Sequence, residues 1–169
     1  LISDAGTLKR IDVSLVGGKN TPAFEAYTNS NQSANHATNV KIQGDVEVYD
    51  SDSDYDKDTN YRFTPTTAGK YFCYMHVSFN GAADREYYVG PNIRLNGTSV
   101  AGAQYTLDTN DGGDNAYSLY KVINCNGSSD YIEYYHYHHD YSASSSVNLL
   151  GINSSQLRTI IGAFRLIGA

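Results

Sequence analysis

The sequence predicts an all-β domain, a sandwich or jelly roll, and three observations lead to that prediction. The 169 residues include 16 Tyr, and aromatic and β-branched residues favour strands. Only 18% of the residues are charged, and no stretch shows the apolar period of an amphipathic helix. Asn-Gly pairs, the strongest short signal for a β-hairpin turn, punctuate the aromatic runs. They are Asn80-Gly81, Asn96-Gly97 and Asn126-Gly127.

Composition and charge exclude several classes of protein. A chain this rich in aromatic residues is not typical of intrinsic disorder. No apolar run approaches the roughly 20 residues of a transmembrane helix, so we expect no membrane insertion. The net charge of −6 argues against nucleic-acid binding, because phosphate contacts depend on Lys and Arg.

The first residues differ from the rest of the chain. Ile11, Val13 and Leu15 alternate with polar residues, which predicts a short extended segment, and Gly17-Gly18 then breaks it. We expect residues 1–20 to be an arm or linker from a longer or attached segment, and residues 21–169 to be the jelly-roll domain. An ordinary first strand is the alternative.

From Thr21 onward, apolar or aromatic runs alternate with turns, giving about eight to ten antiparallel strands. Polar loops rich in Asp, Gly or Ser separate them, as expected at the ends of a sandwich. The predicted strands cover 22–27, 40–49, 70–79, 88–95, 99–107, 116–124, 130–140 and 159–167.

One segment carries a resemblance to a known family. Residues 61–79 read YRFTPTTAGKYFCYMHVSF. Phe63, Gly69 and Tyr71 match, in type and spacing, the signature of the complement C1q and tumour necrosis factor (TNF) jelly-roll superfamily. Residues 22–24 resemble the first strand of that family and residues 161–168 its last. The resemblance covers about residues 22–169 and implies a TNF/complement-type jelly roll that is homotrimeric.

The strand at 70–79 is apolar on both faces. Alternate side chains of a strand point to opposite sides, so Tyr71, Cys73 and Met75 share one face while Phe72 and Tyr74 share the other. A sandwich can bury only one face of this strand against its second sheet. In the resembled family, two further copies cover the other face. We therefore expect a trimer interface, with loops covering this face in a monomer as the alternative. The predicted interface residues are Phe72, Tyr74, His76 and Phe164.

Other features resemble phage proteins. The Asn-, Asp- and Ser-rich loops and the ending 165–169 look like versions of this fold in marine phage structural proteins, and residues 3–12 resemble segments that join fibre shafts to distal domains. The resemblance implies a non-enzymatic virion structural protein of a tailed phage. It would be a trimeric knob on the virion exterior, assembled in the host cytoplasm, which contacts the host surface. The arm would hold other virion proteins. A trimeric capsid decoration protein and a secreted complement- or TNF-like protein-binding domain are the alternatives.

The strand at 130–140 offers a candidate ligand surface. Ile132, Tyr134, His136 and His138 should face inward in the outer sheet. The opposite side would present a tyrosine stripe to solvent, and Tyr supplies rigid contact area with a hydroxyl group. A host surface glycan or a protein is the candidate ligand, and cross-strand aromatic pairing is the alternative. The stripe comprises Tyr131, Tyr135, Tyr137 and His139.

Metal and catalytic signals are sparse. The pair His136 and His138 could bind a transition metal, or simply pack in the domain. Asp52, Asp54 and Asp56 alternate as in an EF-hand loop, but Tyr55 and Tyr61 occupy the positions of its Gly and Glu. Calcium there, alone or with Asp108, Asp111 and Asp114, stays open beside a solvated acidic loop.

No cofactor is otherwise expected. Nucleophile-elbow, P-loop and zinc-protease motifs do not occur in the sequence, so we expect no enzyme. Cys73 and Cys125 are too few for a disulfide-rich scaffold, and whether they pair is left open.

Overall fold

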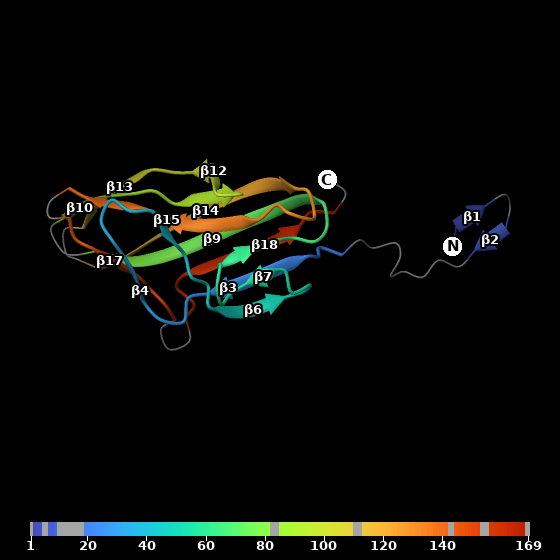
Figure 1. Cartoon of the computed structure of the whole chain (residues 1–169), viewed down its shortest axis with the longest axis horizontal. Helices are drawn as coiled ribbons and strands as arrows, with labels where there is room; N and C mark the ends of the chain where they lie inside the picture. Colours follow the sequence, from blue (N-terminus) through green and yellow to red (C-terminus); the bar gives the residue numbers. More distant parts are fainter. Residues whose placement is uncertain are drawn as a thin grey trace.

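The computed structural model describes residues 2–4, 7–9, 19–81, 85–109, 113–141, 144–152 and 156–167. Within these ranges every regular element is a strand, and all pairings between strands are antiparallel. The long strands run roughly along the long axis of the domain (Figure 1). No helix in the described part of the chain is long and apolar enough to cross a membrane.

The first layer, which we call the inner sheet, is centred on β9. This strand pairs along its whole length with β14, and on its other side with β18 and then β17. Beyond β18 lie β3 and β6, and beyond β17 lies β4. The strands of this sheet are β3 (Ala23–Tyr27), β4 (Gln32–Ala34), β6 (Val46–Asp50), β9 (Gly69–Gly81), β14 (Gly113–Cys125), β17 (Val147–Leu149) and β18 (Ile160–Arg165).

The second layer, the outer sheet, consists of two hydrogen-bonded groups that continue one another along the chain. One group has the order β12-β11-β15-β8-β7, with β5 also pairing with β15, and the other has the order β13-β10-β16. Its strands are β5 (Val40–Lys41), β7 (Tyr55–Asp56), β8 (Arg62–Phe63), β10 (Arg85–Val89), β11 (Asn92–Leu95), β12 (Thr98–Gly102), β13 (Tyr105–Thr109), β15 (Ile132–His136) and β16 (His138–Asp140).

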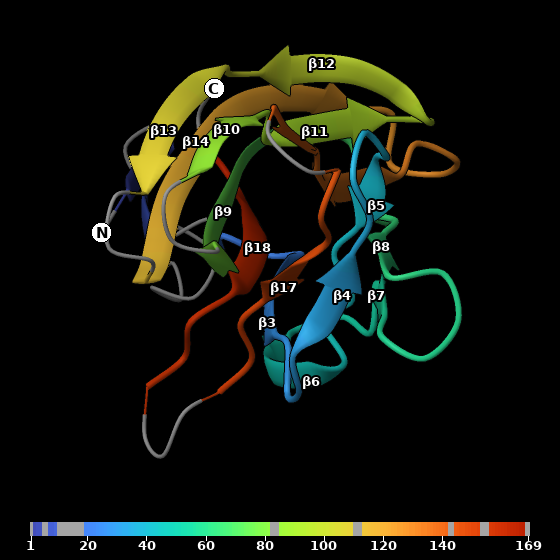
Figure 2. The same ribbon diagram turned by 90° about the vertical axis from the view of Figure 1, so that its left-hand side faces the viewer.

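The core fills the space between the two layers. Figure 2 looks along the long axis, and β9 and β18 lie across the interior from β5 and β8. The ring of Phe24 is stacked between Tyr55, at 4.3 Å between ring centroids, and Phe63, at 4.7 Å. The buried Tyr134 hydroxyl donates to the Gly162 carbonyl at 2.7 Å and so ties the outer sheet to β18. The core is therefore largely aromatic.

The residues that carry the family resemblance have structural roles in this core. Phe63 and Tyr71 are both fully buried, and their rings meet edge-on with centroids 5.8 Å apart. Gly69 begins β9 with φ of 149°, a conformation that side chains disfavour. A Cβ there would also lie 2.9 Å from Arg165 Nε. The Gly-x-Tyr pattern thus starts the central strand and anchors it in the core.

The structure corrects part of the predicted strand and turn assignment. Asn96-Gly97 forms the predicted two-residue turn between β11 and β12, with φ of 53° and 76°. The prediction is wrong at Asn80-Gly81, which are the last two residues of β9 and pair with Asp114 and Gly113 of β14. It is also wrong at Asn126-Gly127, because this loop joins β14 and β15, which belong to different sheets. There the Asn126 side chain accepts backbone N–H bonds from residues 128–130.

Two further differences concern the start of the chain and the strand predicted at 40–49. That strand is two elements, β5 on β15 in the outer sheet and β6 on β3 in the inner sheet. In the predicted arm, β1 (Ile2–Asp4) pairs with β2 (Thr7–Lys9). The alternating segment around Ile11, Val13 and Leu15 lies outside the described residues.

Truncation of Phe24 to Ala should destabilise the domain strongly, because it empties the space between two stacked rings. We expect Phe24→Ala to lower the free energy of unfolding by about 3–5 kcal/mol, measured by urea denaturation. Ile167→Ala is the matched control, because Ile167 is 50% exposed, and its cost should stay within about 0.5 kcal/mol. Equal effects of the two substitutions would contradict this account of the core.

Candidate functional site

The outward side of the inner sheet carries a patch that we call the aromatic face. The strand registers align Tyr120, Tyr74, Gly162, Glu25 and Tyr49 in one row across β14, β9, β18, β3 and β6. The next row aligns Val122 with Phe72 and Phe164. This arrangement places large side chains from strands far apart in the sequence on one continuous surface.

The Tyr74 side chain lies across the neighbouring strand. A Cβ added to Gly162 would be 2.4 Å from the Tyr74 hydroxyl, so only glycine leaves room for the ring. The Tyr74 hydroxyl therefore reaches past β18 and donates to Glu25 Oε2 at 2.6 Å. Burial, together with this hydrogen bond to Glu25, raises the pKa of the Tyr74 hydroxyl far above its ordinary value. The phenol thus stays protonated and holds the carboxylate.

Phe72 is the centre of the aromatic face. Its ring centroid lies 5.4 Å from that of Phe164, 5.9 Å from that of Tyr120 and 6.2 Å from that of Tyr74. Exposure is high at the edges of this cluster, with Tyr120 69%, Tyr49 44% and Val122 43% exposed in the single chain. Soluble monomers seldom expose a contiguous apolar patch of this kind unless it binds something.

The four predicted interface residues share this side of the inner sheet. Phe72, Tyr74 and Phe164 belong to the aromatic face, and His76 lies one row farther along β9, where its Nδ1 is 3.0 Å from Ser118 Oγ. The two-faced pattern of β9 is as predicted, because Tyr71, Cys73, Met75, Val77 and Phe79 are all buried on the opposite side. That another copy of the chain covers the aromatic face stays a prediction.

Sequence reasoning missed the partners of these residues. Tyr120 and Val122 could have been found from the alternation in the strand at 116–124, which puts them on one face. Glu25, Tyr49 and Gly162 could not, because their place beside Tyr74 depends on which strands are neighbours in the sheet.

The predicted tyrosine stripe lies on the outward side of the outer sheet, half-buried by neighbouring side chains. The guanidinium of Arg62 lies 4.6 Å from the centroid of the Tyr131 ring, and that of Arg94 lies 3.9 Å from the Tyr135 ring. Tyr137 meets Tyr88 edge-on at 5.8 Å. His139 is also half-buried, with its ring centroid 4.5 Å from that of His36. Tyr137 and His139 thus make the aromatic contacts of the alternative given for this stripe, whereas Tyr131 and Tyr135 contact arginines.

The two histidines predicted as metal candidates point into the core, as expected for their face of the strand. His136 and His138 are fully buried, with ring centroids 5.5 Å apart. His136 Nδ1 is 2.6 Å from the Tyr117 hydroxyl, and His138 Nε2 is 2.9 Å from the Ser145 carbonyl oxygen. Among the described residues, no three His, Cys, Asp or Glu side chains gather to hold a metal ion.

The acidic loop uses its carboxylates to hold its own backbone. Asp50 accepts N–H bonds from Asp52, Asp54 and Tyr55, at 3.4, 3.2 and 2.9 Å. Asp56 accepts bonds from the backbone of residues 58–60, which lower the pKa of its carboxyl group. Asp54 accepts both the backbone N–H and the hydroxyl of Thr66, and Asp52 accepts the Ser51 hydroxyl. These hydrogen bonds favour the alternative of an acidic loop without calcium, and they add a structural role that was not predicted from the sequence.

The two cysteines are both buried and both free. Burial raises the pKa of the Cys125 thiol to about 12 and that of Cys73 further still. Neither thiol is ionised near neutral pH, so both behave as apolar core groups.

Comparison with known proteins identifies structures with a similar fold. No family model matches the chain, and no curated protein matches it. Solved structures do match. The globular domain of zebrafish complement 1qA protein is 14% identical, with a TM-score of 0.55 over 86% of this chain and 98% of that one. The structure of Eiger TNF from S. frugiperda is 13% identical, with a TM-score of 0.52 over 87% and 93% of the two chains. Murine APRIL, solved at pH 5.0, is 12% identical, with a TM-score of 0.58 over 85% and 98%.

These likenesses, at low identity but over nearly the whole of each chain, confirm the predicted fold. The chain is a jelly-roll β-sandwich of the kind found in complement C1q and TNF domains.

Acid should destabilise the domain through the buried histidines. Burial, and secondarily the neighbouring His138, lowers the pKa of His136 to about 3 from 6.5. The unfolded chain therefore binds the extra proton between these pH values, so stability is full above pH 6.5 and falls as the pH drops below it. We expect a loss of about 1.4 kcal/mol per pH unit from this residue, measured by urea denaturation. His136→Gln should show a shallower slope between pH 7 and pH 5, and an unchanged slope would contradict the assignment.

Calcium should leave the acidic loop unchanged, because its carboxylate oxygens already accept hydrogen bonds. We expect the thermal unfolding midpoint to be the same with millimolar Ca²⁺ as with a chelator. Asp50→Ala, in contrast, removes the acceptor of three backbone bonds and should cost about 1–3 kcal/mol. A calcium-dependent rise in the midpoint that Asp50→Ala or Asp56→Ala abolishes would reinstate the metal site.

Proposed function

We propose that this chain is a non-enzymatic binding domain that assembles as a homotrimer through the aromatic face. The observation that carries the proposal is the exposure of Tyr120, Val122 and Tyr49 around the Phe72 cluster. Obligate oligomers join through large apolar surfaces of this type. The likeness to complement C1q and TNF domains supports the same arrangement.

Polar groups on the aromatic face already make hydrogen bonds within one chain. A buried carboxylate without partners would cost several kcal/mol, but the Glu25 carboxylate accepts a 2.6 Å bond from the Tyr74 hydroxyl. His76 likewise meets the Ser118 hydroxyl at 3.0 Å. The face can therefore be desolvated by other copies without breaking a hydrogen bond.

The setting we propose is the exterior of a tailed-phage virion, with the trimer as a fibre-tip knob that contacts the host surface. The sequence supports it through the Asn-, Asp- and Ser-rich loops, the ending 165–169 and the resemblance of residues 3–12 to fibre-joining segments. Residues 1–20 would then attach the domain to other virion proteins.

The genome around the coding sequence tests this setting. We expect neighbouring tail genes, and a fibre shaft encoded in the same reading frame or beside it. Neighbouring capsid genes, together with binding of the domain to empty capsids, would identify a decoration protein instead. A secretion signal in the same reading frame would overturn the virion role in favour of a secreted binding domain.

Substitution at the aromatic face should dissociate the trimer without unfolding the chain. Tyr120→Lys places an ammonium group where the proposed interface is apolar, whereas in the single chain this position is 69% exposed. We expect sedimentation velocity to show single chains for Tyr120→Lys at micromolar concentration. Tyr141→Lys is the matched control, because Tyr141 is 58% exposed but packs on His139, outside the aromatic face. Retention of the trimer by both variants would exclude this face from the interface.

A further inference from the structure

The strands of the outer sheet are interrupted side by side. The segment β10–β11 breaks at Gly90 and Pro91, β12–β13 at residues 103–104, and β15–β16 at Tyr137. On one side of the break, Val89 pairs with both Tyr105 and His138. On the other side, Asn92 pairs with both Gly102 and Tyr135. The three chain segments therefore have the same pairing register on both sides of the break, although the regular strand pairing is interrupted at the break itself.

The sequence explains the break. Pro91 has no backbone N–H to donate, so the ladder loses a bond there, and Gly90 has no side chain to cover the gap. Two backbone bonds keep the strands together across it. The Gly90 N–H donates to the Tyr137 carbonyl at 2.9 Å, and the Ala103 N–H donates to the Pro91 carbonyl at 3.2 Å. The interruption is therefore a fixed part of the sheet.

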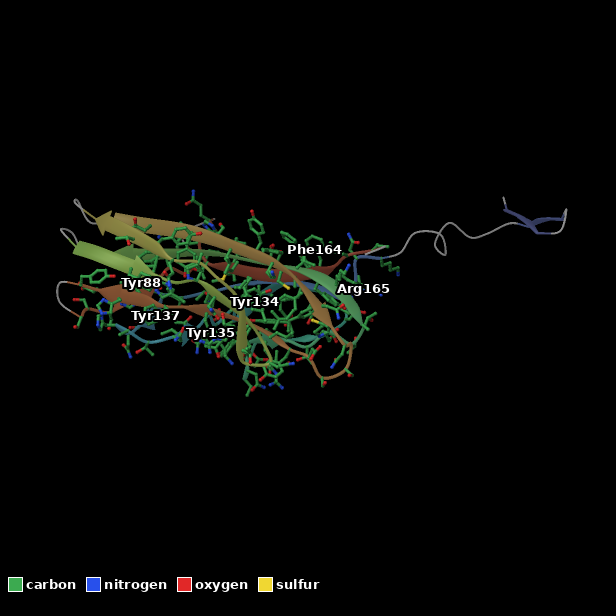
Figure 3. All side chains as sticks on the ribbon, turned by 90° about the horizontal axis from the view of Figure 1, so that it is seen from above. Tyr88, Tyr134, Tyr135, Tyr137, Phe164 and Arg165 are labelled. Carbon is green, nitrogen blue, oxygen red and sulfur yellow. The ribbon has the colours of Figure 1, made fainter. Side chains whose placement is uncertain are left out.

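A cavity of about 570 Å³ lies at this break, which is within the range of about 300–1,000 Å³ typical of small-ligand sites. Tyr88 and Tyr137 form an aromatic wall, with ring centroids 5.8 Å apart. Figure 3 shows both rings toward one end of the sandwich and Phe164 toward the other. The cavity is thus separate from the aromatic face.

The lining includes three residues with carboxamide side chains. Asn39, Asn92 and Gln104 are among the lining residues, and none of the described lining residues carries a formal charge. The Asn92 amide is held in place, since its Nδ2 donates to Ser99 Oγ at 2.6 Å and its Oδ1 accepts from Arg94 Nε at 3.1 Å. Arg94 is itself stacked on Tyr135 at 3.9 Å. Tyr135 thus helps to position the Asn92 side chain through Arg94, and Tyr137 lines the cavity directly.

We propose that this cavity binds an uncharged sugar residue of a surface polysaccharide. Tyrosine rings offer a flat apolar surface to the C–H face of a pyranose, with a hydroxyl at the edge. Carboxamides both donate and accept hydrogen bonds, as sugar hydroxyls require. The described lining residues are uncharged, which favours a neutral sugar over an anionic one. This inference rests on the proposed host-surface role, although the site lies wholly within one chain.

Titration with neutral disaccharides tests the site directly. The probes are lactose, cellobiose, maltose and N,N′-diacetylchitobiose, with sialyllactose as the charged comparison, followed through the backbone amide NMR signals of the intact chain. We expect at least one neutral probe to shift the signals of Gly90, Gly102 and Ala103 at millimolar concentration. No shift with any neutral probe, or a stronger response to sialyllactose than to lactose, would overturn the proposal.

Single substitutions test whether the sugar binds in the cavity or elsewhere on the outer sheet. Tyr137→Ala and Gln104→Ala should each weaken binding about tenfold or more, and Gln104 is exposed, so its variant should fold normally. Tyr131→Ala is the control, because Tyr131 stacks on Arg62 and does not line the cavity. Equal loss in the control and the cavity variants would overturn the site.

Measuring the oligomeric mass of the same samples tests the proposed trimer independently of the sugar site. A trimer that binds no neutral sugar would refute the sugar site alone, and a monomer that binds one would refute the trimer alone.

Discussion

Strand β9 carries large apolar side chains on both of its faces, and this constraint shapes the rest of the structure. Tyr71, Met75 and Phe79 fill the core on one side, while Phe72 and Tyr74 gather further aromatic side chains on the other. A single sandwich satisfies only the first side. The pairing of β9 with β14 over its whole length brings Tyr120 and Val122 beside the Phe72 cluster, so the unsatisfied side becomes a broad surface. Because residue 162 is glycine, the Tyr74 side chain can cross β18 and its hydroxyl can donate a hydrogen bond to Glu25.

The outward surfaces of the two sheets differ in chemistry, and we assign them different roles. The inner sheet presents an apolar surface suited to other copies of the chain. The outer sheet is braced by stacked pairs such as Arg62 on Tyr131 and Arg94 on Tyr135, and Gly90-Pro91 interrupts it to leave a polar cavity. Assembly would multiply that cavity on one particle, and several weak sites on one particle bind a repetitive surface far more tightly than one site does.

Much of the fold could be predicted because local patterns determine it. Alternation in 70–79 and 130–140 predicted most of the buried side chains, and the Gly-x-Tyr pattern at Gly69 and Tyr71 predicted the central strand. Alternation failed at Glu133, which was expected on the solvent side with the tyrosine stripe but is buried and paired with Lys41. Turn signals failed where long-range pairing overrode them, as at Asn80-Gly81, which β14 holds in an extended strand. The aromatic row and the cavity could not be predicted in full. Both depend on strand order and register. These place Glu25 and Tyr74 on either side of Gly162, and Gly90 opposite Tyr137.

Sedimentation equilibrium of the unmodified chain at micromolar concentration tests the central claim most directly. If β9 needs cover on both sides, the measured mass is three times the 18.5 kDa of one chain. A stable mass of 18.5 kDa, with the aromatic face in contact with water, would contradict the account.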